Sequence, residues 1–187
     1  MKKNNSLETH FLHYQMGDAT LPQMKGNQII AHVCNDCGAW GKGFVLSISK
    51  RFKAPEKAYR DWYAGRATNA FGLGKIQIVQ VEDHIWVANM VAQHGIKKTR
   101  VSKSSRSQGS VPIRYDAVRE CLQALAQEAL VRNASIHMPR IGCGLAGGTW
   151  EEIEPLILDS LCKESLSVYI YDWESFEAST RREKKEN

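Results

Sequence analysis

Two glycine-rich segments have the composition of phosphate-binding loops. Residues 32–43 hold three glycines within six positions, Gly38, Gly41 and Gly43, and residues 139–148 are similarly rich. Glycine lets the backbone turn sharply and approach a ligand without a side-chain clash. Each segment leads into a predicted helix, whose free amides and positive dipole end favour phosphate. One such loop alone would fit a tight strand-to-helix turn, whereas two in one small domain indicate a diphosphate held between them.

A metal or redox site is the other chemistry that the first segment allows. His32, Cys34 and Cys37 include a Cys-x-x-Cys pair, which can ligate zinc or lower a thiol pKa. No second pair of Cys or His at a typical spacing completes a zinc set, and a glycine-rich turn follows Cys37. We therefore predict no metal and no cofactor, and interpret these thiols as packing residues. The chain has five scattered cysteines, an odd number that indicates reduced thiols.

Length and composition indicate one soluble domain. The 187 residues are enough for one domain with a core and short for two, and 43% of them are hydrophobic. No apolar run approaches the roughly 20 residues of a membrane span, and residues 1–8 lack the apolar part of a secretory signal. We predict a cytoplasmic protein with no membrane partner. It would have a flexible N-terminus (1–9), one domain (10–174) and a polar, disordered C-terminal tail (175–187).

Positive charge is concentrated in two stretches of the chain. The formal net charge is +5, and much of the excess lies at residues 97–106 and 181–185. Such runs are usually solvated. Residues 95–112 are rich in Lys, Ser and Arg without periodicity, so we expect a long loop there. A basic nucleic-acid-binding domain is one hypothesis for this charge, and it ranks last because no aromatic pattern or recognition helix accompanies it.

Hydrophobic periodicity predicts the elements that position the glycine-rich segments. Strands are expected at 11–16, 28–33, 135–138 and 166–171, and a hairpin is expected from 76–81 and 85–90. Helices are expected from residue 43, from Pro55, over 115–129, and from a capping box at 149–152 to about 161. Pro155 implies a kink or a later start in the last of these. The pattern predicts an α/β fold with a mixed sheet covered by helices on both faces, in which ligands bind beyond the carboxyl ends of strands.

Three motifs that occur in a fixed order along the chain connect the predicted α/β fold to one protein family. Gly17-Asp18-Ala19-Thr20, the 32–43 segment and Pro139-Arg140-Ile141-Gly142-Cys143-Gly144-Leu145 resemble the three ligand loops of a macrodomain. The likeness spans about residues 11–173, and Val91-Ala92-Gln93-His94 is similar to the same branch. That branch contains the terminal ADP-ribose protein glycohydrolase and the yeast ADP-ribose 1''-phosphate phosphatase. The resemblance implies a three-layer α/β/α macrodomain fold, with a mixed, mostly parallel central sheet of about six strands.

The resemblance also implies a role for each loop. Asp18 would accept a hydrogen bond from the adenine amino group with help from the Ala19 amide, although an Asp that ends a strand can simply close a turn. Trp173 would stack beside the adenine or cap the core. The diphosphate and distal ribose would be held by Gly41, Lys42, Gly43 and Phe44 from the first segment, and by Arg140, Ile141, Gly142, Cys143, Gly144, Leu145 and Ala146 from the second.

Departures from the family pattern concern the catalytic residues. The glycohydrolase uses a Lys nucleophile and an Asp, and the corresponding positions hold Gln93 and Ala146, which can neither form a Schiff base nor take a proton. The first loop instead resembles that of the yeast phosphatase. It offers Asn35 and His32 as candidates to hold the ligand and to orient or deprotonate water. His32 could equally bond to a backbone carbonyl, and Asn35 could cap its own loop.

Three hypotheses for function remain at this point. The first is a hydrolase that acts on ADP-ribose 1''-phosphate or on an ADP-ribosyl ester without the Lys and Asp pair. The second is a non-catalytic reader that binds ADP-ribose or ADP-ribosylated protein. The third is the nucleic-acid-binding domain that would use residues 97–106. The first two share one predicted partner, ADP-ribose or an ADP-ribosyl derivative.

Overall fold

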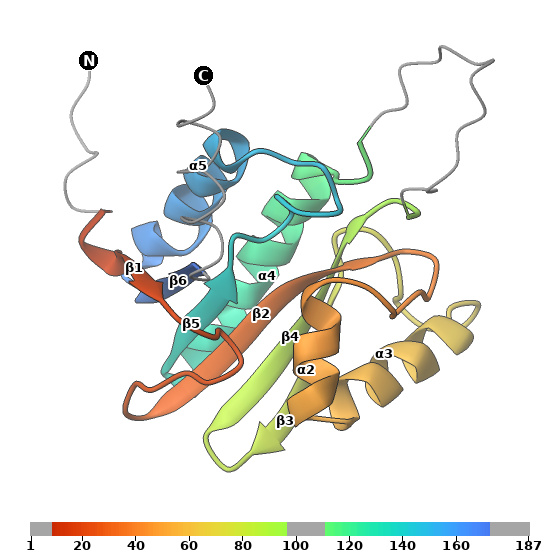
Figure 1. Ribbon diagram of the computed structural model, residues 1–187, viewed down its shortest axis with the longest axis horizontal. Coiled ribbons are helices and arrows are strands. Elements are labelled where there is room, and N and C mark those ends of the chain that lie inside the picture. The colour runs from red at the N-terminus through yellow and green to blue at the C-terminus, as the bar shows by residue number, and fades with distance from the viewer. Residues whose placement is uncertain (1–8, 97–110, 173–187) are drawn as a thin grey trace, which may run out of the picture.

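A six-stranded sheet forms the centre of the molecule (Figure 1). The computed structural model describes residues 9–96 and 111–172, and within them the strand order is β1-β6-β5-β2-β4-β3. Neighbouring strands are parallel except β3 and β4, which form the predicted antiparallel hairpin. The strands are β1 (Leu12–Met16), β2 (Asn27–Asn35), β3 (Ile76–Glu82), β4 (Ile85–Gln93), β5 (Ala134–Pro139) and β6 (Val168–Asp172). The sheet is therefore mixed and mostly parallel, as the sequence predicts.

Helices cover both faces of the sheet (Figure 1). They are α2 (Phe44–Arg51), α3 (Ala54–Ala64), α4 (Tyr115–Arg132) and α5 (Trp150–Ser160), with short 3₁₀ helices η1 (Thr9–Phe11) and η2 (Cys162–Glu164). Successive side chains of a strand point to opposite faces, so Ile29 packs with α4 and α5 while Ile30 packs with α2 and α3. The two apolar cores lie on opposite sides of one sheet, which makes the fold a three-layer α/β/α arrangement.

Several local predictions differ from the structure. Thr149 is the N-cap residue of α5, but its side chain forms no capping hydrogen bond, so the predicted capping box is wrong in its contacts. The Thr149 amide instead donates to the Tyr115 hydroxyl at 3.2 Å. Pro155 lies inside α5, which begins at Trp150 and not later. Phe11 belongs to η1, and the last strand begins at Val168, two residues after the predicted position.

Parts of some predictions lie outside the described residues. These are the flexible N-terminus up to residue 8, the basic stretch 97–106, Trp173 and the tail 175–187. Over residues 9–96 and 111–172, none of the helices combines the length and apolar character that crossing a membrane requires.

Because all strands but β3 run in the same direction, the segments after β1, β2, β4 and β5 leave the sheet at one edge. The β1 segment begins at Gly17, and the segments after β2 and β5 are the two glycine-rich loops. The topology thus gathers all three predicted ligand loops beyond the carboxyl ends of the strands, where α/β sheets bind ligands.

Candidate functional site

The two glycine-rich loops enclose one cavity of about 260 Å³. Most of the residues predicted to hold the diphosphate and distal ribose line it: Lys42, Gly43, Phe44, Arg140, Ile141, Gly142, Gly144, Leu145 and Ala146, together with His32. The lining also includes Val33, Gln93 and Pro139, which lie within the motifs, and Val45, which follows the first glycine-rich segment. Gly41, Cys143, Asp18, Ala19 and Asn35 are not among the lining residues. The structure therefore brings the two loops together as the sequence predicts, and places some predicted residues behind or beside the wall.

A second hollow lies at the β3 edge, between α3 and α4. Its volume is about 480 Å³, and its lining includes Trp62, Lys75 and Glu120. Neither glycine-rich loop reaches it, and its lining includes the acidic Glu120, which disfavours an anion. We therefore place the candidate site in the smaller cavity, where several predicted residues meet.

Gly43 lies where the first glycine-rich loop approaches the second. Gly43 is the N-cap residue of α2 with φ 81°, in the left-handed region that favours glycine. A Cβ atom at Gly43 would lie 3.5 Å from Leu145 Cδ1, on the opposite loop. The amides of Phe44 and Val45 follow directly after Gly43 in the first turn of α2, whereas the Leu46 amide donates to the Gly43 carbonyl at 3.1 Å. The loop geometry thus presents a helix N-terminus to the cavity, which is a favourable place for phosphate.

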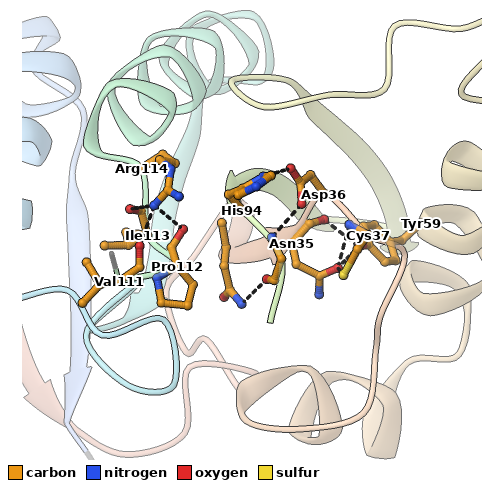
Figure 2. A network of polar contacts seen from close by, with 11 residues as sticks. Asn35, Asp36, Cys37, Tyr59, His94, Val111, Pro112, Ile113 and Arg114 are labelled. Atoms are coloured by element: carbon orange, nitrogen blue, oxygen red, sulfur yellow. Dashed lines mark hydrogen bonds and ion pairs between the residues drawn. The ribbon is translucent and has the colours of Figure 1, made fainter. Parts of the chain in front are cut away.

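Asn35 organises the first loop from inside. Its Oδ1 accepts hydrogen bonds from the amides of Cys37 (3.1 Å) and Ala39 (3.0 Å), and its Nδ2 donates to the Ala39 carbonyl at 2.6 Å. The Tyr59 hydroxyl donates to the Asn35 carbonyl oxygen at 2.6 Å (Figure 2). Asn35 is only 9% exposed. Asn35 was a candidate catalytic residue, with capping of its own loop as the alternative. Its contacts in the structure are those of a residue that caps its own loop.

His32 is a neutral side chain in the cavity wall. It is 1% exposed, and its burial lowers the pKa to about 4, against the opposing effect of its bond to Asn89. Asn89 Nδ2 donates to the Pro55 carbonyl and to Gln77 Oε1, both at 3.1 Å, so its Oδ1 is the atom that faces His32. His32 Nε2 lies 2.6 Å from this acceptor and must carry the proton. His32 is therefore an uncharged Nε2–H tautomer at neutral pH, bonded to Asn89, and a backbone hydrogen bond with Val33 also acts on its pKa.

Asp36 connects the first loop to the end of β4. Its Oδ2 lies 2.6 Å from His94 Nδ1, and its Oδ1 accepts a hydrogen bond from the Gly95 amide at 2.8 Å (Figure 2). Partial burial raises the pKa of this carboxyl, but the Gly95 amide and His94 outweigh that effect and lower the pKa below its usual value. Asp36 is therefore a carboxylate at neutral pH. It fixes the chain just after Gln93, which lines the cavity.

Arg140 is paired with an acidic residue beside the cavity. Its Nε and Nη2 donate to the two carboxylate oxygens of Asp172 at 2.6 and 2.8 Å. Its guanidinium carbon also lies 5.2 Å from the Tyr14 ring centre and 4.9 Å from that of Trp150. The Asp172 hydrogen bonds raise the pKa of Arg140. The expected phosphate-binding cation therefore already has an anionic partner, which the sequence did not reveal.

The adenine end is only partly described. Asp18 Oδ1 accepts hydrogen bonds from the amide and the hydroxyl of Thr20, both at 2.8 Å, so the carboxylate closes its own turn. Ala19 is 2% exposed and is therefore buried in the protein interior. Trp173, predicted to stack on the base, lies outside the described residues. Among the residues described here, no group of three or more His, Cys, Asp or Glu is placed to hold a metal ion.

Comparison with known proteins identifies the family of this chain. No family model matches the sequence. The solved structure of a macrodomain protein from Streptomyces coelicolor is 50% identical, covers 86% of this chain and 98% of its own chain, and superposes with a TM-score of 0.75. The chain belongs to the macrodomain family. A Bacteroides thetaiotaomicron protein of unknown function is also 50% identical, over 86% of this macrodomain and 97% of its own chain, with a TM-score of 0.79.

Curated relatives of this macrodomain include two kinds of protein. The mouse chromodomain-helicase-DNA-binding protein 1-like is 29% identical over 174 residues, and the match covers 88% of this chain but only 18% of the relative. The ADP-ribose 1''-phosphate phosphatase of Meyerozyma guilliermondii is 23% identical over 160 residues, covering 78% of this chain and 91% of the relative. This macrodomain thus corresponds to a small part of the first relative and to most of the second.

Proposed function

We propose that this macrodomain binds ADP-ribose or an ADP-ribosyl derivative, with the diphosphate between the two glycine-rich loops. The observation that carries the proposal is that both loops border one cavity, where Gly43 at the start of α2 faces Leu145. Among the described residues that line the cavity, none is acidic, so nothing in its wall repels an anion. The substrate named in the phosphatase relatives is a derivative of the same nucleotide.

Calorimetric titration with ADP-ribose tests this binding, and two glycines provide a matched pair of variants. No atom lies within 4 Å of a Cβ built on Gly144 or on Gly72, so each position accepts a side chain without a clash. Gly144 lines the cavity and Gly72 does not. Gly144→Glu places a negative charge beside the diphosphate and should weaken binding at least tenfold, whereas Gly72→Glu should leave binding unchanged. Absence of wild-type binding at millimolar ligand would refute the proposal.

The proposed reaction is hydrolysis of ADP-ribose 1''-phosphate or of an ADP-ribosyl ester by water. In the first case, water adds to the phosphorus, the bond from phosphorus to the 1''-oxygen breaks, and ADP-ribose and inorganic phosphate are released. Because Gln93 and Ala146 occupy the positions of the glycohydrolase pair, this route uses no covalent Lys intermediate. Asn35, which holds the first loop in shape, would act by positioning the backbone around the phosphate.

A non-catalytic reader is the second candidate, and the state of the cavity favours it. His32 is neutral and bonded to Asn89, and the Arg140 guanidinium is paired with Asp172. A reader needs shape and hydrogen bonds but no group that exchanges protons. Release of phosphate from ADP-ribose 1''-phosphate by the wild type, compared with Asn35→Ala, separates the candidates. Release by the wild type supports the hydrolase, and no release by either protein, together with intact ADP-ribose binding, leaves the reader.

A further inference from the structure

Positive and negative charges are separated between the two helical layers that cover the sheet (Figure 1). Residues 42–66, which include α2 and α3, contain seven Lys and Arg but only two acidic residues, Glu56 and Asp61. Residues 115–164, which include α4 and α5 on the opposite face, contain eight acidic residues but only four Lys and Arg. The described part of the chain therefore has a basic layer and an acidic layer. A polyanion is attracted to the first and repelled by the second.

Three cations meet at the junction of α2 and α3. Lys50 and Arg51 end α2, and Lys53 is the N-cap residue of α3. All three residues are exposed, and none of the described carboxylates forms an ion pair with them. Arg51 donates to the uncharged Thr20 hydroxyl at 3.3 Å. The two acidic residues of α3 are instead paired with cations of their own helix. The positive charge at this junction is thus not neutralised within the described residues.

Lys53 lies where a cation opposes the stability of the fold. The N-terminus of a helix has a partial positive charge, so acidic residues are favourable there and Lys is unfavourable. Lys50 and Arg51 add charge of the same sign two and three positions earlier. Those two cations are themselves favourable, because they lie at the C-terminus of α2. The charge of Lys53 has no such structural reason, and an anionic partner outside the chain supplies one.

The surroundings of the junction distinguish between kinds of anionic partner. None of the aromatic side chains in residues 42–66 is exposed, and Leu46, 52% exposed, is the one large apolar side chain of this segment that is. Surface binding to a membrane uses inserted apolar side chains in addition to charge. Protein interfaces are rich in aromatic residues and poor in Lys, and single-stranded nucleic acids stack on aromatic rings. The phosphates of a duplex backbone need only cationic and polar groups.

We propose that Lys50, Arg51 and Lys53 bind the phosphate backbone of a nucleic-acid duplex without reading its sequence. The surface is separate from the ADP-ribose cavity, since none of these three residues lines that cavity. It is also separate from the basic stretch 97–106, which lies outside the described residues. Repulsion by the acidic layer turns α4 and α5 away from the duplex. The contact does not depend on the proposed function, because it needs no ligand in the cavity.

Fluorescence anisotropy with a labelled DNA duplex of mixed sequence, about 20 base pairs long, tests the proposal. We expect the affinity of the wild type to fall as salt is raised, with a slope of log K against log [salt] of about −3 for three phosphate contacts. The double variant Lys50→Glu/Lys53→Glu should bind the duplex at least about tenfold more weakly at about 50 mM salt, with a slope shallower by about 2. Its titration with ADP-ribose should match that of the wild type.

The double variant Lys97→Glu/Lys98→Glu is the matched control. It changes the net charge by the same amount but lies in the basic stretch 97–106. We expect it to lose much less affinity for the duplex than Lys50→Glu/Lys53→Glu. Equal losses would show that only the net charge matters, and a larger loss in the control would assign the contact to the other stretch, so either result overturns the proposal. Absence of wild-type binding to the duplex at about 50 mM salt, or binding to vesicles of anionic lipid but not to the duplex, would overturn it as well.

Lys53→Glu separates an effect on binding from an effect on folding. A glutamate at this position complements the dipole of α3 and lies four positions before Lys57, so the melting temperature should be unchanged or higher. The same variant should bind the duplex at least about threefold more weakly, with a salt slope shallower by about 1. A folded Lys53→Glu protein with unchanged affinity for the duplex would exclude Lys53 from the contact and overturn the proposal.

Discussion

The guanidinium group of Arg140 and the carboxylate of Asp172 form two parallel hydrogen bonds, 2.6 Å from Nε to Oδ1 and 2.8 Å from Nη2 to Oδ2. The contact joins the start of the second glycine-rich loop to the end of β6, 32 residues further along the chain. Tyr14 and Trp150 pack near the same guanidinium, and the Trp150 indole donates to the Tyr14 hydroxyl at 3.0 Å. The loop that closes over the proposed diphosphate is thus anchored at its base by a pair with fixed geometry.

Replacing Asp172 determines whether Arg140 anchors the loop or binds phosphate directly. If Arg140 anchors the loop, Asp172→Ala and Arg140→Ala should both weaken ADP-ribose binding, because either change releases the loop. If Arg140 binds the diphosphate, Asp172→Ala should instead strengthen binding, because it frees the guanidinium from its partner. We expect the first result, with a loss of about 1 kcal/mol in the free energy of unfolding for each variant. Titration calorimetry and urea denaturation measure the two effects.

Asn35→Ala should destabilise the protein whether or not the protein is an enzyme. The substitution leaves the amides of Cys37 and Ala39 without their acceptor in a partly exposed loop, in which Cys37 is exposed and Ala39 is half-buried. Because water can reach these amides, we expect a loss of about 1 kcal/mol in the free energy of unfolding, the typical contribution of a hydrogen bond. Asn35→Asp retains the acceptor and should lose less. Unchanged stability in Asn35→Ala, together with lost phosphate release, would instead assign Asn35 a direct catalytic role.

Local sequence patterns predicted the elements and the location of the cavity. The apolar run of β2 and the spacing of Val45 and Ile48 in α2 depend on neighbouring residues, so the local sequence reveals them. The glycines after β2 and β5 mark loops because only glycine readily adopts the φ values seen at Gly43 and Gly142. These features are encoded within a few residues. They sufficed to predict a mixed sheet with two ligand loops at one edge.

Contacts between distant residues were not predictable in the same way. His32 bonds to Asn89, 57 positions away, and that contact together with burial decides its protonation. The pairing of Arg140 with Asp172 likewise depends on β5 and β6 being neighbours in the sheet. Thr149 has the residue type of a helix cap, yet its side chain makes no capping bond. Chemical state and partner choice arise from the tertiary structure, and the sequence therefore predicted the cavity better than the roles of its side chains.

Gly43→Ala should weaken ligand binding more than it affects the fold. The residue has φ 81°, which costs a side chain about 1–2 kcal/mol, and its Cβ would point toward Leu145 at 3.5 Å. The added methyl group occupies the narrow part of the cavity where the two loops meet. We expect ADP-ribose affinity to fall at least tenfold, with a modest drop in melting temperature. Gly26→Ala is the matched control, since Gly26 also has a positive φ, 84°, with no atom within 4 Å of its Cβ. Equal binding losses in both variants would show that strain, and not occupation of the cavity, is responsible.

Two buried histidines should make the protein less stable as the pH falls below neutrality. Burial lowers the pKa of His32 and of His137 to about 4, from the 6.5 of an exposed histidine. Between pH 6.5 and pH 4 the unfolded chain therefore takes up protons at both positions while the folded chain does not. Each histidine then lowers the free energy of unfolding by up to about 1.4 kcal/mol per pH unit, and above pH 6.5 neither contributes a slope.

The slope between pH 6.5 and pH 5 can be measured by urea denaturation. This window lies above the region where carboxylates such as Asp36, whose folded pKa is lowered, begin to lose their contribution. His137 bonds to Ser135 at 2.8 Å and to Tyr171 at 2.9 Å, and a glutamine can retain one of these partners without titrating. We expect His137→Gln to be less stable at pH 7 and to show about half of the wild-type slope. A slope equal to that of the wild type would mean that His137 is protonated in the folded protein, contrary to its burial.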